Sequence, residues 1–127
     1  MKSFLAAAVD AGNRSFALVQ ASDRRVVVPR LELAIDSASR RKGLLGREGL
    51  EEGTGLVIAP SNAVHTFFMR FAIDIVFLNR SGRVLKIRPR VPARRVDLSA
   101  TAHAVLELPA GAAVAAGISV GDTLALQ

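Results

Sequence analysis

The stretch FAIDIVFLNRSGRVLKIRPRV, residues 71–91, decides the fold class. Residues 73–78 are apolar apart from one acid, which predicts a strand covered on both faces. Residues 79–82, Asn-Arg-Ser-Gly, predict a tight turn, since Asn suits its first position and Gly tolerates a positive φ at its fourth. In residues 84–91, apolar side chains alternate with basic ones, namely Leu85, Ile87 and Val91 with Lys86, Arg88 and Arg90. The stretch therefore predicts a β-hairpin.

The chain outside this hairpin also has the pattern of short strands joined by turns. Residues 15–20 and 26–28 flank a polar turn, and residues 31–35 alternate as in a half-buried strand. Further strands are predicted at residues 56–59, 103–108 and 123–126, with short helices at residues 38–45 (N-cap Asp36 or Ser37) and 112–116. We expect one domain over residues 1–127 of mainly β (α+β) class. Its core would be a compact antiparallel barrel-like or sandwich arrangement of about seven to eight short strands with two short helices.

Composition narrows the classes of function. The chain has 127 residues, which fits a single domain, and no cysteine, which excludes disulfides, thiolate metal sites and a cysteine nucleophile. Its net charge of +6 favours an anionic partner without specifying any chemistry. The apolar run from Phe4 to Val9 is shorter than a signal-peptide core, and no stretch is long enough to span a bilayer. We therefore expect an ordinary N-terminal strand and a cytoplasmic protein, and the sequence leaves the oligomeric state open.

Several segments, in this order along the chain, resemble a known family. They are RKGLLGR (residues 41–47), Gly-Leu (55–56), HTFFMRFAIDIVFL (65–78), SGRV (81–84), VLELPAG (105–111), Gly-Ile (117–118) and Gly-Asp (121–122). Together they resemble the bacterial and archaeal family called domain of unknown function 192, over about residues 30–126. The resemblance implies a compact β-rich domain and carries no established activity. The chain departs from the family pattern at Leu45, Phe68 and Ala72, where the family often has Met, Trp and Pro.

Two acids in apolar strands are the first candidates for chemistry. Asp74 lies among apolar residues 71–77, and Glu107 lies between two leucines. A buried carboxylate is costly unless it is paired or hydrogen-bonded. Asp74 is therefore either a general acid/base or ligand-binding group, or a structural aspartate that accepts backbone N–H bonds or pairs with an arginine. If their strands pair, Asp74 and Glu107 would form a carboxylate pair of the kind glycosidases use.

A second group of candidates precedes Asp74. His65, Met69 and Asp74 are possible ligands of a transition metal, but their spacing matches no standard metal pattern, so we predict no metal and no cofactor. Met69 is interpreted as a core residue, and His65 as a loop-end residue or the wall of a small pocket. As an alternative function, His65 and Asp74 would act as acid and base in a small hydrolase-like enzyme.

A basic stripe is the remaining feature. Residues 80–95 contain no acid, and Lys86, Arg88 and Arg90 share a strand face, as the alternation shows. The stripe is either a solvated outer face or a track for an anionic partner, nucleic acid or membrane. Interleaved aromatics for base stacking are absent from it. The nucleic-acid alternative would use Arg83, Lys86, Arg88, Arg90, Arg94 and Arg95.

The sequence favours binding over catalysis, because few residues of catalytic type are present. We predict a non-catalytic binding or interaction module whose pocket or groove takes a small molecule or peptide. The residues predicted to line this pocket or groove are His65, Thr66, Met69, Arg70, Asp74 and Glu107.

Overall fold

A computed structural model describes residues 3–6 and 16–127 of the chain. In chain order its elements are β1 (Phe16–Gln20), β2 (Val26–Ala34), α2 (Ser37–Lys42), β3 (Thr54–Ile58), β4 (Ala63–His65), β5 (Ile73–Leu78), β6 (Val84–Val91), β7 (Val96–Leu98), β8 (Ala104–Pro109), α3 (Ala112–Ala115) and β9 (Leu124–Leu126). The mainly β class is therefore confirmed. No helix within the described ranges is long and apolar enough to cross a membrane.

Seven strands form one curved sheet, in the order β6-β5-β8-β3-β2-β1-β9, and β4 pairs with β7 in a separate small sheet. Every neighbouring pair is antiparallel except β2 and β3, which run parallel. Just before the outer strands β6 and β9, Arg83 and Thr123 form an isolated antiparallel bridge. The sheet is not closed into a barrel, so of the two predicted arrangements the sandwich-like core fits.

The large sheet packs apolar side chains on both of its faces. On one face Leu18, Val57 and Leu106 belong to a core cluster that also takes in Ala113 of α3. On the other face a second cluster includes Leu56 and Ile75 of the sheet, with Leu44 after α2. This double covering explains why β5 and β8 read as nearly unbroken apolar runs.

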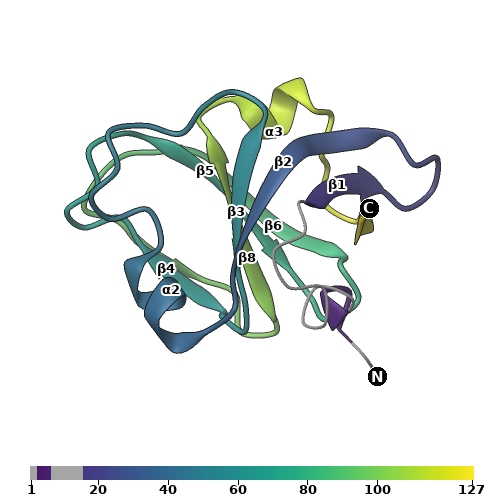
Figure 1. Cartoon of the computed structure of the whole chain (residues 1–127), viewed down its shortest axis with the longest axis horizontal. Coiled ribbons are helices and arrows are strands. Elements are labelled where there is room, and N and C mark those ends of the chain that lie inside the picture. The colour runs from purple at the N-terminus through teal and green to yellow at the C-terminus, as the bar shows by residue number, and fades with distance from the viewer. Residues whose placement is uncertain (1–2, 7–15) are drawn as a thin grey trace.

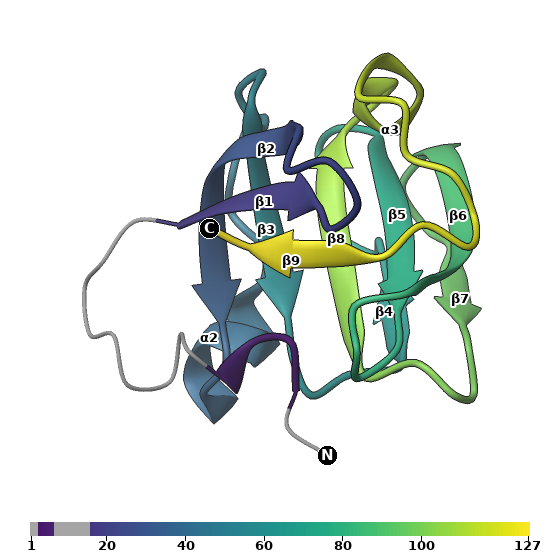
Figure 2. The ribbon, with the colours of Figure 1, turned by 90° about the vertical axis from the view of Figure 1, so that its right-hand side faces the viewer.

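Different elements cover the two faces. Figure 1 shows β1 on one side of the central strands β3 and β8, with α2 and β4 on the other side. In Figure 2, β1 and β9 run side by side across the first face, as their pairing at Leu18–Leu126 requires. The space between α2 and β4 is where the candidate site lies.

Most predicted elements are present, with shifted ends. The hairpin is confirmed as β5 and β6, and Asn79 holds its turn by accepting from the backbone N–H groups of Ser81 and Arg83. The helix predicted at residues 38–45 ends earlier, because Gly43 at φ +47° forms its C-cap, while Asp36 is the N-cap as expected. The short strands β4 and β7 were not predicted, since three residues carry too little alternation.

The predicted N-terminal strand is only partly within the described residues. Residues 4–5 form a turn and residue 6 is helical, so none of the three is in a strand, and the Phe4 N–H donates to the Arg80 carbonyl at 2.8 Å. Leu5 is buried in the core. Residues 1–2 and 7–15, which hold the rest of that segment, lie outside the described residues.

Candidate functional site

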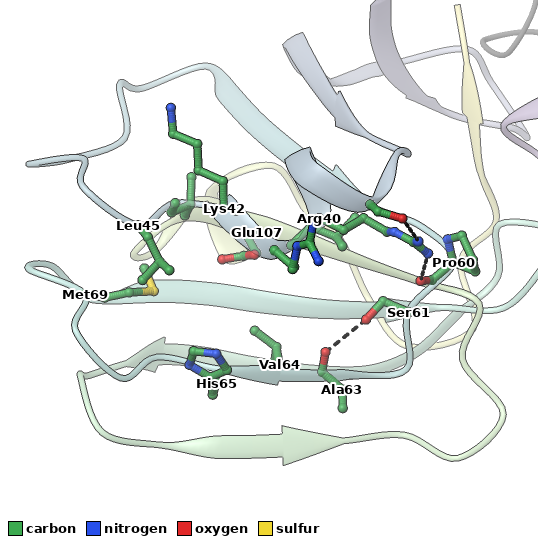
Figure 3. Close-up of a pocket in the computed structure, with 15 residues that line it drawn as sticks. Arg40, Lys42, Leu45, Pro60, Ser61, Ala63, Val64, His65, Met69 and Glu107 are labelled. Carbon is green, nitrogen blue, oxygen red and sulfur yellow. Dashed lines mark hydrogen bonds between the residues drawn. The ribbon is translucent and has the colours of Figure 1, made fainter.

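A pocket of about 390 Å³ opens between α2 and β4, over the ends of β3 and β8 (Figure 3). Its volume is near the lower limit of small-molecule sites. Three segments supply most of its walls: α2 with the loop after it, the end of β3 with the residues that follow, and β4. Met69 and Glu107 of β8 complete them. The lining residues are Ser37, Arg40, Arg41, Lys42, Gly43, Leu44, Leu45, Ile58, Pro60, Ser61, Ala63, Val64, His65, Met69 and Glu107.

Glu107 is the acid of this pocket. Its side chain comes from the middle of β8 and is 2% exposed, and Figure 3 shows it between α2 and β4. Burial raises the pKa of Glu107 to about 7, although the positive charge of Arg47 acts in the opposite direction. Among residues 3–6 and 16–127, no donor forms a hydrogen bond or ion pair with its carboxyl group, whose oxygens keep some exposure at the pocket.

The chain geometry around Glu107 leaves room for a ligand. A Cβ on Gly43, at the end of α2, would lie 4.0 Å from a Glu107 carboxyl oxygen. Because Gly43 has φ +47°, a larger residue there would be strained as well as closer. The short helix thus ends directly over the acid, with no side chain between them at this position.

The walls of the pocket are apolar and one side of it is cationic. Leu44, Ile58 and Met69 belong to or pack against the core cluster of this face. Along α2, Arg40 and Arg41 bring positive charge to the pocket, while Figure 3 shows the Lys42 ammonium directed away from Glu107. Arg40 is fixed there, since its guanidinium donates to the Pro60 carbonyl at 3.2 Å and to the Ser37 hydroxyl at 3.4 Å (Figure 3).

The predicted site residues divide into two groups. His65 and Met69 line the pocket with Glu107, His65 as an exposed residue of β4 and Met69 as a buried one. Thr66 does not reach it: its hydroxyl donates to the Pro92 carbonyl at 2.7 Å and accepts from the Arg95 N–H at 2.9 Å. Arg70 points to solvent, where it approaches Glu48 at 3.7 Å.

Asp74 lies outside the pocket, fully buried within the sheet. Its carboxylate accepts three backbone N–H bonds, from Arg90 at 2.8 Å, Gly111 at 3.0 Å and Ala113 at 2.9 Å. Two of these donors belong to the start of α3, so Asp74 caps that helix from a distant strand. This is the structural alternative considered for Asp74, and its oxygens have no room for a substrate.

The register of β5 and β8 separates the two acids. The strands do pair, but Asp74 lies opposite Leu108, whereas Glu107 lies opposite Ile75. Neighbouring positions on a strand point to opposite faces, so the two carboxylates are on opposite faces of the sheet. The predicted carboxylate pair of Asp74 and Glu107 therefore does not form. Nor does the acid/base pair, because His65 covers the face that Asp74 points away from.

The basic stripe is divided and partly neutralised. Lys86 and Arg88 form ion pairs with Asp97 of β7, at 2.5 and 2.7 Å. Burial alone would raise the pKa of Asp97, but hydrogen bonds from these cations and from the Leu98 N–H lower it overall. The pairing of β5 with β6 is irregular between Ile75–Arg88 and Ile73–Val91, so Arg90 does not continue the alternation as predicted. Arg83, Arg94 and Arg95 are exposed.

Sequence reasoning missed most of the pocket. It identified Glu107, His65 and Met69 but none of the wall supplied by α2 or by residues 58–64. The available signal was the segment RKGLLGR at residues 41–47, which contributes five pocket residues, from Arg41 to Leu45. Within the described residues, no three His, Asp or Glu side chains gather as a metal site.

Known proteins resemble this chain in sequence and in fold. No curated protein matches it. A solved protein of unknown function from Novosphingobium aromaticivorans is similar with 28% identity and a TM-score of 0.73, over 87% of this chain and 82% of that one. A solved protein from Sinorhizobium meliloti, described as a "putative transcription regulator", is similar with 25% identity and a TM-score of 0.74, over 87% of this chain and 90% of that one. The model of the domain of unknown function 192, "Uncharacterized ACR", matches residues 17–126, so the chain belongs to this family.

Proposed function

We propose that the protein is a non-catalytic binding module that takes a small molecule in the pocket between α2 and β4. The observation that carries the proposal is Glu107, an acid that is 2% exposed, has no protein partner among the described residues and keeps its carboxyl oxygens open only to the pocket. Buried polar groups in native proteins nearly always have hydrogen-bond partners. A ligand that donates a hydrogen bond or carries a positive charge would supply the partner that Glu107 lacks.

The rest of the pocket supports one class of ligand. Apolar walls at Leu45, Ile58 and Met69 favour a mainly apolar body. The cation Arg41 of α2, which lines the same pocket, favours an anionic group next to the one that reaches Glu107. We therefore expect a small amphiphilic molecule with an ammonium, amide or hydroxyl group at Glu107 and a carboxylate near α2. A free amino acid with an aliphatic side chain, or a peptide terminus, has these groups.

The proposal assigns no catalytic step, because the pocket lacks a nucleophile with an activating partner. Ser37 and Ser61 line the pocket, but the Ser61 hydroxyl donates to the Ala63 carbonyl, and the Ser37 hydroxyl accepts from Arg40. Neither contacts His65 in a hydrogen bond. The hydrolase alternative needed Asp74 beside His65, and these residues lie on different sides of the sheet.

Three probes with the same apolar body test the proposal: leucine, 3-methylbutylamine, which lacks the carboxylate, and 4-methylpentanoate, which lacks the ammonium. Each is titrated at pH 8 into the ¹⁵N-labelled protein, and amide shifts are followed at residues 37–45 and 61–65. Leucine is expected to bind more tightly than either single-group probe. Glu107→Gln should weaken leucine and the amine but not the acid, whereas the exposed-site control Glu52→Gln should change nothing. Absence of shifts at the pocket up to tens of millimolar with all three probes would exclude this ligand class.

A further inference from the structure

A second surface, on the outer side of β4 and β7 and adjoining the pocket at Ala63 and His65, also lacks a partner. The large apolar side chains that are exposed in the described part of the chain are Val26, Phe67, Phe68, Val96, Leu98, Val114 and Val120. Four of these residues, Phe67, Phe68, Val96 and Leu98, belong to β7 or to the loop that follows β4. Scattered exposed apolar residues are ordinary, but a gathered group marks an interaction site.

Strand pairing brings these side chains to one face. β4 and β7 pair with His65 opposite Val96 and Ala63 opposite Leu98, so these four residues share the outer face of the small sheet. Between them Val64 packs inward against the core. The Phe67 ring continues the outer face, with its centroid 6.0 Å from that of His65. We call Ala63, His65, Phe67, Phe68, Val96 and Leu98 the β4–β7 outer face.

Phe68 is held in a conformation that its own packing does not explain. Its φ is +66°, a region that bulky residues rarely adopt, and it is 86% exposed. Asn or Gly would adopt this conformation more easily. A strained, projecting aromatic residue is the kind of feature found where a protein contacts a partner.

Exposed arginines lie beside the outer face, near Phe67. Arg94 and Arg95 are exposed, and their loop is bound to Thr66, just before Phe67, by hydrogen bonds from the Arg95 N–H and the Arg94 N–H. Arg70 lies two residues after Phe68, and its approach to Glu48 is solvent-exposed and weak. The acid of β7, Asp97, is already paired with two cations.

The face is therefore apolar with a cationic margin, which is complementary to an anionic and apolar partner. A second copy of the chain would bring the same arginines against each other. Single-stranded nucleic acid would use the two phenylalanines for base stacking but would leave the aliphatic Val96 and Leu98 without a role. A lipid surface uses all of these groups, since aromatic and aliphatic side chains enter the headgroup boundary and arginines contact lipid phosphates.

We propose that the β4–β7 outer face docks on an anionic lipid bilayer, with Phe68 entering the headgroup boundary and Arg94 and Arg95 on lipid phosphates. The contact is peripheral and needs no spanning segment. Ala63 and His65 also line the pocket, but the docking does not use Glu107, so Glu107→Gln should bind lipid as the unmodified chain does.

Vesicle co-sedimentation tests the docking, using phosphatidylcholine vesicles with and without an equal part of phosphatidylglycerol. The protein should sediment with the anionic vesicles and at least about tenfold less with phosphatidylcholine alone, and binding should weaken at high salt. Phe68→Asn should keep the fold, because Asn tolerates a positive φ, and should lower partitioning several-fold. Removing both charges in Arg94→Gln/Arg95→Gln should lower it by about 25-fold, at roughly fivefold per cation.

Matched controls lie elsewhere on the surface. Val114→Thr on α3 removes an exposed apolar side chain, and Arg24→Gln in the β1–β2 turn removes an exposed charge; neither should change partitioning. Val96→Thr, which keeps a β-branched residue in the strand, is the second variant if Phe68→Asn loses its circular dichroism spectrum.

Three results would overturn the proposal. The first is no sedimentation with anionic vesicles. The second is vesicle partitioning that falls equally in the control variants, or that does not fall in Phe68→Asn and Val96→Thr. Either result would indicate adsorption by net charge alone. The third is Phe68-dependent binding to an oligothymidylate, measured by fluorescence anisotropy, with no vesicle binding; the face would then be a site for single-stranded nucleic acid.

Discussion

Replacing Glu107 by Gln should make the protein more stable at pH 8 and leave its stability at pH 4 nearly unchanged. The reason is the burial of the carboxyl group, which raises its pKa from an ordinary 4.5 to about 7. Gln has nearly the same size and stays neutral at every pH. The substitution therefore removes the titration and keeps the volume of the side chain.

The sign follows from the protons bound in each state. Below pH 4.5 the carboxyl group is protonated in both the folded and the unfolded chain, and it contributes no pH dependence. Between pH 4.5 and about 7 the unfolded chain loses this proton while the folded chain retains it, so the free energy of unfolding falls as the pH rises. Above about pH 7 both states are ionised and no further loss occurs.

The size of the loss follows from the same two pKa values. At about 1.4 kcal/mol per pH unit, the rise from 4.5 to about 7 corresponds to about 3 kcal/mol. This is a large share of the roughly 5–15 kcal/mol by which folded domains are stable. At 2% exposure, little solvent screening reduces it. Glu107→Gln should thus gain about 3 kcal/mol over the unmodified chain between pH 4 and pH 8.

Urea unfolding at a series of pH values measures the difference. The chain has no Trp or Tyr, so far-UV circular dichroism is the signal to follow. Other titrating groups, such as His103, whose pKa is lowered by burial and by Arg80, are common to both proteins and cancel in the difference. Parallel stability curves for the two proteins would refute the reasoning, because they would mean that Glu107 ionises in the folded state as easily as in the unfolded one.

Three further substitutions test the framework around the site, each by thermal unfolding. Asp74→Asn places an amide donor against backbone N–H groups and should lower the free energy of unfolding by about 2–4 kcal/mol. The control Asp23→Asn, in the exposed β1–β2 turn, should lower it by under about 0.5 kcal/mol. A nearly unchanged Tm for Asp74→Asn would contradict its capping role. Gly82→Ala should cost about 3 kcal/mol, since a Cβ there would lie 2.2 Å from the Leu124 carbonyl oxygen at φ +89°, and Gly49→Ala, in open space, should be nearly neutral. Asp97→Asn should lower the free energy of unfolding by about 1 kcal/mol or less at pH 7. The difference from the unmodified chain should vanish in acid, because the pKa of Asp97 lies below its usual 3.8. A loss of stability that persists at pH 2 would point to packing instead.

Local pattern was sufficient for the elements that carry their own signals. The β5–β6 hairpin could be predicted because an apolar run, a turn led by Asn79 and an alternating strand follow one another within residues 73–91. The bulge near Arg90 could not be predicted. It depends on the Asp74 carboxylate accepting the Arg90 N–H, sixteen residues away in the chain. The pairing is also irregular at its other end, between Phe77–Lys86 and Leu78–Val84, so regular alternation covers only Lys86 to Arg88.

The candidate site was harder, because similar local patterns have different outcomes. Asp74 and Glu107 are each an acid in an apolar strand, and the sequence gives no reason to separate their roles. Strand register decides which face each one points to, and register is a property of two segments about thirty residues apart. The basic stripe of residues 80–95 was equally hard to interpret. Asp97, which forms ion pairs with Lys86 and Arg88, lies two residues beyond the stripe, and its strand β7 brings it to these two cations.

Asp74 and Glu107 also serve as an internal comparison for the proposed function. Both are nearly inaccessible to solvent in adjacent strands of one sheet, so the fold imposes a similar desolvation on each. At Asp74 the fold provides three backbone donors, which shows that it can satisfy a buried acid where the acid is structural. At Glu107 the described residues provide none, and a pocket stands in their place. A purely structural residue at this position would be more stable as Gln, or as an apolar side chain of similar volume. An acid that lowers stability at neutral pH is explained if a ligand supplies its hydrogen-bond partner. Binding sites in general lower the stability of the fold in return for function.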